Sequence, residues 1–576
     1  MPHHHHLALA LLSLSAFQPF SPSALSAASA APADYPIGAI VQPARNTSLG
    51  ALTGDRDNAA AINATQVIYG SDGAPLRAVL RSRNRLKIPI PTLVYTGGLT
   101  TNPGTDLAAL ERNYRSAIAM TPAATLAADI DAATTQIPLA DPTGGELAIK
   151  ASTAAYSDSK DSSKFCFWIR IDDELMRVTA ITPARQRPIQ NPVPSEATSS
   201  SKIQNSIVIT VERGFSKTTP APHAARARVF SPVYQGNRED AHAARHPNAW
   251  PGSTDDPRLL YTLDPRSPDA QKFKAALVVD VMRQGCDGAW FDTFQIRPFN
   301  ICDALGRKLA NFWDFKTGAT YQKENYIEAM KDYLRGIRAL VRAATGREPV
   351  IFANNVTGTY KDGAKQIFNH GDTRDLLDGY SFEDSYFKTQ ATRDKTKSNE
   401  AKASFFPLTG DKWLTNVTNH ADAATSGLRG LCMAGPAGYV AQYINSAQPN
   451  YAQLIRYAYA SFLLTVTKER TTMFGLPMLV SDKNAATGIV PWPRVLNAGI
   501  GDPLQENKID TLKVPGTPCY MRRFQNGIAI VNPSAEGKSP STVPIPAGYI
   551  DAMTGKPAPT QLALPPADAA ILIRVR

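Results

Sequence analysis

The sequence predicts an α/β protein: a (β/α)8 TIM barrel, interrupted by an inserted small β domain and followed by a C-terminal β-sandwich. Short apolar runs alternate with amphipathic helical segments along most of the chain, a pattern typical of parallel strands joined by helices. Several of these runs end on carboxylates or amides, as expected where barrel strands enter the loops that form active sites. The alternation breaks between residues 121 and 229, which predicts the inserted domain.

Bulk composition restricts the function classes. The chain has 576 residues, enough for two or three domains, with 43 % hydrophobic and 19 % charged residues. The net charge is +11, but Lys and Arg are scattered without a dense basic run, which argues against nucleic acid as a partner. After the N-terminal segment, no apolar run reaches the roughly 18 residues of a membrane span.

The N-terminal segment predicts a signal peptide over residues 1–30. Residues 7–17 form a short apolar core, and Ala28-Ser29-Ala30 fits a cleavage site with small residues. The segment before this core contains four histidines and no Lys or Arg. We therefore expect a secreted protein, extracellular or periplasmic.

The barrel is expected over residues 31–120 and 230–500. Its first part should contain strands at 37–43, 66–69 and 91–95 and helices at 74–83 and 106–120. Its second part should contain strands at 228–234, 258–261, 285–292, 350–355, 377–383, 428–434 and 470–474, with helices at 268–284, 323–344 and 451–466. About eight of these ten runs are expected to form the barrel.

Residues 121–229 predict a small β module. Short strands are expected at 136–139, 165–171, 175–181 and 206–211, and the tract 182–201 is polar and rich in proline. The module resembles small β modules of phage tail and other extracellular proteins. Asp173, Glu174 and His223 are residue types that bind metals, but the resemblance places them in structural turns. It favours a spacer over a carbohydrate-contacting role, and we expect no metal site.

The C-terminal segment, residues 501–576, predicts the β-sandwich. Residues 519–524 and 528–531 flank an Asn526-Gly527 turn and read as a hairpin, and the run 570–575 forms a further strand. The five cysteines form no CxxC pair. A bridge between Cys286 and Cys302 and buried thiols are both open alternatives.

Two carboxylates follow separate strands of the predicted barrel. Asp292 ends the strand after the helix at 268–284, and Glu383 ends a later one. Asn354 and Asn355 end the strand between them. Because the carboxyl ends of barrel strands share one rim, these side chains should meet there, and a carboxylate pair is what glycoside hydrolysis requires.

The surroundings predict which carboxyl has which role. Glu383 lies among aromatic residues, which favours a protonated general acid, whereas amides such as Asn354 or Asn355 would hold an ionised Asp292. Capping a helix or pairing with Arg is the alternative for both, and Asp384 is the rival acid.

Further rim residues are candidates for substrate contacts, each with a structural alternative. Asp264 can contact substrate or form a turn with Pro265, and Asn355 can bind a sugar hydroxyl or fix a loop. Aromatic side chains stack on sugar faces or pack in a core; the candidates are Tyr95, Trp290, Trp313, Trp413 and Tyr386. Asp287 and Asp378 precede glycine where strands begin and are expected to be turn formers.

Five segments carry a resemblance to a known class of barrels. They are LLYTLDP (259–265), DGAWFDTF (287–294), VIFANN (350–355), DGYSFED (378–384) and YMRRFQNGIAIVNPS (520–534). Together they resemble the poorly characterised bacterial glycoside-hydrolase-like barrels and, more distantly, endo-α-1,4-polygalactosaminidase and α-galactosidase type barrels. The resemblance implies that the carboxylate ending the fourth strand, Asp292, is nucleophile or base and that Glu383, near the sixth strand, is the acid/base.

The sequence therefore predicts a secreted glycoside hydrolase acting on a poly- or oligosaccharide, without cofactor or metal. A non-catalytic carbohydrate-binding or adhesion protein on the same scaffold is the alternative. No GxSxG, HExxH, P-loop or GxGxxG motif supports another reaction class. The distance between the two carboxyl groups discriminates: about 5–5.5 Å indicates retention and about 6.5–9.5 Å inversion.

Overall fold

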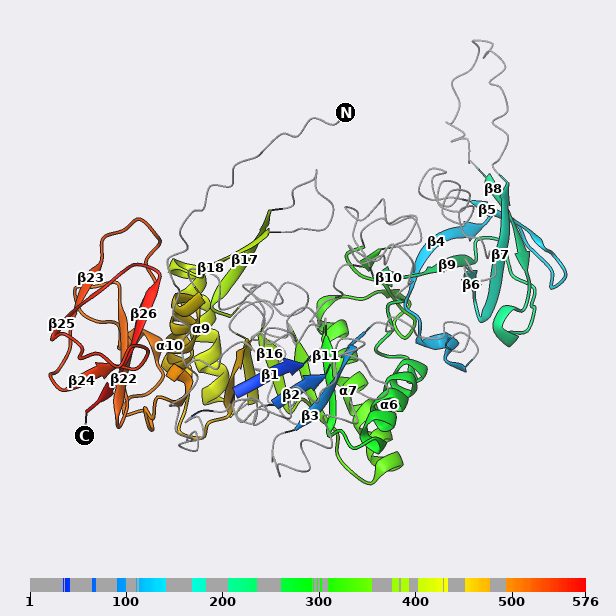
Figure 1. Ribbon diagram of the computed structural model, residues 1–576. Helices are drawn as coiled ribbons and strands as arrows, with labels where there is room; N and C mark the ends of the chain where they lie inside the picture. Colours follow the sequence, from blue (N-terminus) through cyan, green and yellow to red (C-terminus); the bar gives the residue numbers. More distant parts are fainter. Residues whose placement is uncertain are drawn as a thin grey trace, which may run out of the picture.

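Figure 1 shows the computed structural model of the chain. It describes residues 35, 37–41, 65–68, 91–99, 110, 113–140, 168–182, 206–235, 261–292, 294, 298, 301–302, 309–354, 376–382, 385–392, 402–427, 429–433, 451–476 and 494–575. Within these ranges, none of the helices has the length and apolar character needed to cross a membrane.

Eight parallel strands form a closed ring at the centre of the molecule. In order around the ring they are β1 (Ile37–Val41), β2 (Thr65–Ile68), β3 (Thr92–Gly97), β11 (Gly288–Asp292), β15 (Val350–Asn354), β16 (Gly379–Phe382), β19 (Arg429–Met433) and β20 (Thr472–Leu476). The ring closes because β1 pairs in parallel with β20, with Ile37 opposite Phe474. The predicted barrel strands at these positions are present, with limits shifted by a few residues.

Four helices that connect barrel strands lie among the described residues: α6 (Pro268–Arg283), α7 (Lys323–Thr345), α9 (Gly410–Thr425) and α10 (Tyr451–Thr465). The Ser267 side chain accepts hydrogen bonds from the first turn of α6, and α7 ends at Gly346, which adopts a left-handed conformation. The sequence predicted α6, α7 and α10 but missed α9. The predicted helix at 74–83 lies outside the described residues.

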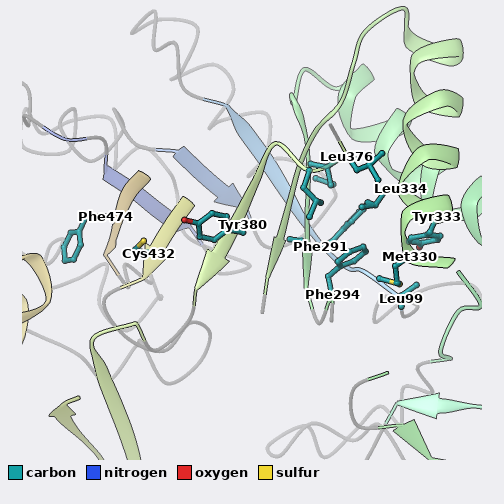
Figure 2. Close-up of a cluster of buried hydrophobic side chains, with 14 of the residues drawn as sticks. Leu99, Phe291, Phe294, Met330, Tyr333, Leu334, Leu376, Tyr380, Cys432 and Phe474 are labelled. Carbon is teal, nitrogen blue, oxygen red and sulfur yellow. The ribbon is translucent and has the colours of Figure 1, made fainter. Parts of the chain in front are cut away.

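The main core lies between the strands and these helices. In the cluster drawn in Figure 2, Phe291 of β11 lies near Leu334 of α7, while Tyr380, Cys432 and Phe474 come from successive strands β16, β19 and β20. Side chains of a strand alternate between its two faces, so Phe291 faces the helices and Trp290 faces the barrel interior. Gly288 permits the close approach of β11 to β15, since a Cβ there would lie 1.9 Å from the Val350 carbonyl oxygen.

The inserted domain is a second, smaller closed barrel of six antiparallel strands. They are β4 (Met120–Leu126), β5 (Gln136–Ala140), β6 (Trp168–Ile171), β7 (Glu174–Thr182), β8 (Ser206–Glu212) and β9 (Arg228–Pro232). Its interior is filled by apolar side chains such as Ile137, Ile171 and Met176. In Figure 1 it lies apart from the large barrel, beyond β10 (Tyr234–Gln235).

Two predictions near this insertion are wrong. The helix expected at 106–120 does not reach its predicted end, because Arg115–Ala117 form a 3-10 turn and Met120 begins β4. The run 228–234 is not a strand of the large barrel, because it contains β9, which closes the small barrel against β4. Of the run 258–261 only Tyr261 lies within the described residues, and it forms an isolated antiparallel bridge with Tyr234. An apolar run shows that a segment is buried, but not which sheet it joins.

The C-terminal region contains two antiparallel sheets. One has the order β21 (Tyr520–Arg523), β22 (Gly527–Asn532), β26 (Asp568–Arg574), β24 (Tyr549–Asp551), and the other pairs β23 (Ser541–Pro544) with β25 (Gln561–Leu564). The sheets share an apolar core that includes Ile530, Val543 and Leu564. The other face of β22 and β26 packs on the large-barrel core through Val531 and Ile571, so β22 is buried on both faces.

The structure partly decides between the two alternatives for the cysteines, a Cys286–Cys302 bridge or buried thiols. Cys286, Cys432 and Cys519 are buried thiols, so the Cys286–Cys302 bridge is not formed. Cys286 lies in the short turn between α6 and β11, where it is fully buried.

Arg522 connects the C-terminal sheet to the large barrel. Its side chain is only 1 % exposed, and its Nη1 donates to the carbonyl oxygens of Leu463, Leu464 and Val466 at the C-terminal end of α10. Its Nε and Nη2 donate to the Gln505 carbonyl oxygen. Burial lowers the pKa of Arg522 to about 10, so the guanidinium stays charged at neutral pH and complements the negative end of the helix dipole.

Replacing Arg522 with Met should lower the free energy of unfolding by about 3 kcal/mol, because buried carbonyl oxygens at the end of α10 would lose their donors. Denaturant unfolding followed by circular dichroism measures the loss. The exposed neighbour Arg523, changed to Met, is the control and should have little effect. Equal stability of the two variants would contradict this role of Arg522.

Candidate functional site

The additional structure of the large barrel is concentrated at one end. The connection after β3 contains the inserted barrel, and the connection after β11 contains β12 (Ile301–Cys302), β13 (Trp313–Asp314) and β14 (Ala319–Thr320). The connection after β16 contains the hairpin of β17 (Phe387–Thr392) and β18 (Lys402–Pro407). At the opposite end, helices return to strands through the short segments 284–287, 346–349 and 426–428. The end with long connections is the carboxyl end of the strands, where barrel enzymes carry their active sites.

Asp292 and Asn354 meet at this carboxyl end. Asp292 is the last residue of the fourth strand, β11, and Asn354 is the last residue of the fifth, β15. The Asn354 Nδ2 donates to Asp292 Oδ1 at 2.8 Å. Asn354 is fully buried, whereas Asp292 is partly exposed. The amide therefore holds the carboxylate from the buried side, and solvent still reaches Asp292.

Asp292 is also held through its backbone. The Gly98 amide, just after β3, donates to the Asp292 carbonyl oxygen at 2.8 Å. In the β3–β11 register Asp292 lies opposite Gly97. The sequence had marked this segment only as the end of a strand, yet it forms the immediate neighbour of the candidate carboxylate.

Three predicted aromatic contacts are fully buried. Trp290 is 0 % exposed inside the barrel, two residues before Asp292. Tyr386 is also 0 % exposed, and its hydroxyl lies 2.9 Å from His420 Nδ1 on α9. Burial lowers the pKa of His420 to about 3, which keeps the imidazole neutral. Trp413 of α9 is 0 % exposed as well, and its Nε1 donates to Ser461 Oγ at 2.8 Å. All three aromatic residues therefore pack in the core.

Asp264 lies in a buried polar cluster before α6. Its Oδ1 accepts hydrogen bonds from the Tyr321 hydroxyl at 2.8 Å and from the Arg266 amide at 3.0 Å. Asp314 is fully buried beside it and pairs with Arg266 at 3.4 Å. Burial, reinforced by Asp314 and opposed by these hydrogen bonds and by Arg266, raises the pKa of Asp264 to about 6. The Asp264 carbonyl oxygen also accepts from the Ser267 amide, which gives the residue its turn role.

The remaining predicted site residues cannot be placed. Asn355, Glu383 and Asp384 lie outside the described residues, and Tyr95 is described only as part of β3. Glu383 directly follows β16, the sixth strand of the ring, in the sequence.

Asp287 and Asp378 lie at the opposite end of the barrel from Asp292. Asp287 Oδ2 accepts the Thr92 amide of the neighbouring strand at 2.7 Å, and Asp378 Oδ2 accepts the Ile351 amide at 2.7 Å. Asp378 also pairs with Arg338 of α7. Both carboxylates extend the hydrogen-bonding ladder at the amino ends of the strands, a structural role.

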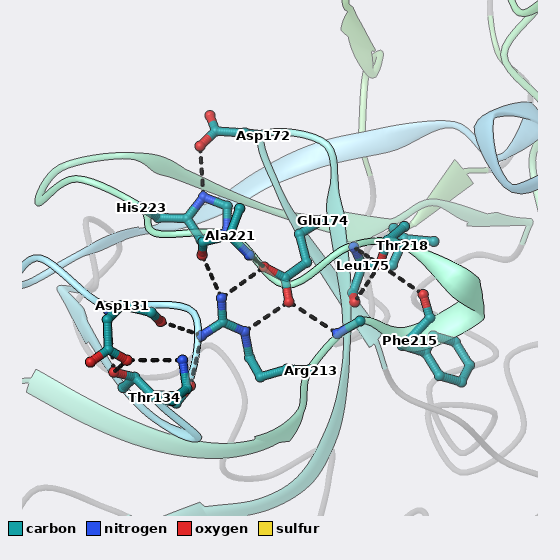
Figure 3. Close-up of polar contacts among 12 residues, drawn as sticks. Asp131, Thr134, Asp172, Glu174, Leu175, Arg213, Phe215, Thr218, Ala221 and His223 are labelled. Carbon is teal, nitrogen blue, oxygen red and sulfur yellow. Dashed lines mark hydrogen bonds and ion pairs between the residues drawn. The ribbon is translucent and has the colours of Figure 1, made fainter.

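The inserted barrel contains a buried charged network, drawn in Figure 3. Glu174 pairs with Arg213 through two contacts of 2.7 and 2.8 Å and accepts the Gly214 and Ala221 amides, each at 3.0 Å. His223 lies between Glu174, at 3.0 Å, and Asp172, at 2.8 Å. The oxygens of Glu174 are thus engaged by protein donors, which agrees with the structural interpretation of these residues.

Two buried polar side chains near the site were missed by the sequence analysis. Lys274 of α6 and Tyr333 of α7 reach the backbone at the end of β3. A signal for Lys274 existed, because it lies four residues from Ala270 and four from Val278, on the apolar face of the helix. Among the described residues, no group of His, Cys, Asp and Glu side chains has the arrangement of a metal site.

No protein-family model matches the chain, and no curated protein matches it. Among solved structures it is similar to a family GH13_31 enzyme, with a TM-score of 0.42, 9 % identity and coverage of 94 % of this chain and 99 % of that one. It is also similar to a Flavobacterium johnsoniae GH31 dextranase, with a TM-score of 0.34 and 8 % identity, covering 94 % of this chain and 52 % of the dextranase. The glycoside hydrolase domain of Pseudomonas aeruginosa PelA matches with a TM-score of 0.23 and 10 % identity over 42 % of this chain and 75 % of that domain.

These similar structures are glycoside hydrolases. The chain spans about half of the dextranase. At these identities and TM-scores the similarity assigns no substrate and no residue role.

The network around Glu174 predicts an acid-dependent loss of stability. Burial alone would raise the pKa of Glu174, but Arg213, the two backbone amides and His223 outweigh it and lower this pKa from 4.5 to about 2. The stabilisation is therefore complete above about pH 4.5 and is lost as the pH falls towards 2. Replacing Glu174 with Gln should remove about 3 kcal/mol at neutral pH and flatten this acid limb.

Calorimetric unfolding between pH 7 and pH 2 measures the effect. The matched control is Asp173→Asn, because that carboxylate is fully exposed and pairs with Arg170 at the surface. An acid limb that is identical in wild type and Glu174→Gln would refute the assignment.

Proposed function

We propose that the protein is a secreted glycoside hydrolase that cleaves a poly- or oligosaccharide at the carboxyl end of its barrel. Asp292 acts as nucleophile or base, and Glu383 acts as general acid/base. The observation that carries the proposal is the Asp292–Asn354 contact, a partly exposed carboxylate held by a buried amide at the ends of adjacent parallel strands. Barrel active sites are built at this position.

The chemistry requires a carboxylate that faces the sugar carbon and an acid that protonates the leaving oxygen. The Asn354 N–H donates to one oxygen of Asp292 and fixes the direction of the carboxylate, as a nucleophile or base needs. The remaining partial exposure of Asp292 leaves a path for substrate.

The acid role of Glu383 is supported by its place in the chain. In the sequence it follows the sixth strand, two strands beyond that of Asp292, and stands between Tyr380 and Tyr386, which are both fully buried. Apolar surroundings favour a carboxyl group that keeps its proton until the leaving group takes it. Asp384 is the competing residue for this role.

We propose fewer substrate-contacting residues than the sequence analysis did. Asp264, with Tyr321 and Arg266 fixing one of its oxygens, remains a candidate contact, as do Asn355 and Tyr95. Asn354 is better described as the residue that orients Asp292, because its side chain is fully buried. Trp290 supports the same rim from inside the barrel.

Hydrolysis of a panel of polysaccharides and aryl glycosides tests the proposal with wild type, Asp292→Asn and Glu383→Gln. Both variants should fold normally and lose about three orders of magnitude or more in kcat, because each removes a group needed in the transition state. NMR of the first product identifies its anomer and separates retention from inversion.

The control is Asp332→Asn on the exposed face of α7, which should keep full activity. Binding of a glycan by all variants without cleavage by any would instead support the carbohydrate-binding alternative. Retention of activity by Glu383→Gln and its loss in Asp384→Asn would transfer the acid role to Asp384.

A further inference from the structure

We propose that Lys274 and Tyr333 are positioning residues for the reaction: they hold the end of β3 against Asp292 and so fix the direction of the carboxylate. The inference rests on the function proposed above. It adds a role for two helix residues that do not touch the substrate.

The first step is the coupling between Asp292 and the end of β3. The Gly98 amide donates to the Asp292 carbonyl oxygen at 2.8 Å. A Cβ on Gly98 would lie 2.9 Å from that same oxygen and 2.9 Å from Phe294 Cδ2, so the two segments are in direct contact. A shift of Gly98 therefore shifts the backbone that carries the Asp292 side chain.

The second step is the attachment of Gly98 to α7. The Tyr333 hydroxyl donates to the Gly98 carbonyl oxygen at 2.8 Å, and the tyrosine is 0 % exposed. In Figure 2, Tyr333 lies beside Met330 and Leu99. The hydroxyl gives this buried carbonyl oxygen its hydrogen-bond donor. Because apolar packing fixes the tyrosine ring, the hydrogen bond connects Gly98 firmly to the long helix α7.

The third step is the attachment of Gly97 to α6. Lys274 is 0 % exposed, and its Nζ donates to the Gly97 carbonyl oxygen at 2.5 Å and to Thr96 Oγ1 at 3.3 Å. Burial lowers the pKa of Lys274 to about 7, which reflects the cost of placing an amine there. The contacts of Nζ with Gly97 and Thr96 offset this cost, and a methionine of similar volume would lack them.

Asp292 is consequently held from two sides. Asn354 of β15 fixes its carboxylate oxygen, and β3, supported by Lys274 and Tyr333, fixes its backbone. Catalysis is sensitive to small displacements of a reacting group, so loosening one support should reduce turnover more than binding.

The test compares Tyr333→Phe with Tyr326→Phe. Both tyrosines lie on α7 and are almost fully buried, but the Tyr326 hydroxyl has no hydrogen-bond partner within the described residues. Tyr333→Phe should lower kcat about 10-fold with KM unchanged. Tyr326→Phe should keep the wild-type kcat.

A second readout needs no substrate. Hydrogen exchange of peptides covering residues 91–99 and 288–294 should be faster in Tyr333→Phe and in Lys274→Met, and unchanged in Tyr326→Phe. Gly98→Ala disturbs the same contact from the other side and should also lower kcat while KM stays constant.

The outcomes separate the two proposals. If Asp292→Asn is as active as wild type, or if wild type cleaves nothing, the glycosidase proposal fails and the exchange data alone decide whether Tyr333 holds the Asp292 segment. If Asp292→Asn is inactive but Tyr333→Phe matches Tyr326→Phe in kcat, the positioning role is refuted. Unchanged exchange in both peptides refutes it with or without a substrate.

Discussion

The common direction of the eight barrel strands is the constraint on which the candidate site depends. Because β3, β11 and β15 pair in parallel, their last residues lie side by side, and Gly97, Asp292 and Asn354 become neighbours although they are far apart in the sequence. The same direction sends the inserted barrel and the β17–β18 hairpin to the end of the barrel that holds Asp292. The additional structure and Asp292 are thereby collected at one rim, while the other end keeps short connections.

The two aspartates at the ends of β11, Asp287 before it and Asp292 as its last residue, illustrate how the strand direction decides the role of a residue. Asp287 precedes the strand, and its carboxylate accepts a hydrogen bond from a backbone amide of β3. Asp292 ends the strand and is partly exposed. Asp378 repeats the arrangement of Asp287 before β16, with a guanidinium of α7 added. Identical side chains thus bond to backbone amides at the amino end of the sheet, whereas at its carboxyl end Asp292 bonds to the Asn354 side chain.

Local patterns were sufficient to predict most strands, three of the helices and the position of Asp292 at a strand end. They could not assign partners. The run at 228–234 is apolar in either barrel, and only its antiparallel pairing with β4 decides that it belongs to the small one. Tyr386 looked like a rim aromatic because its partner His420 is on a helix that the sequence analysis missed. Lys274 was overlooked for a similar reason, since the carbonyl that it binds is 177 positions away.

Helix α6 is the element at which the candidate site, the inserted barrel and the polar cluster of Asp264 come together. At its start, Ser267 and Asp269 bond to Ser116, next to β4, at 3.1 and 2.7 Å. The strand ends of the inserted barrel are joined to the segment before α6, because Ala119 and Val233 bond to Thr262 and to each other. About two turns after Ser267, Lys274 holds the end of β3 beside Asp292. A force that displaces the inserted barrel would therefore act on α6 first and reach the end of β3 through Lys274. The inserted barrel is thus connected by hydrogen bonds to the helix that contacts the end of β3.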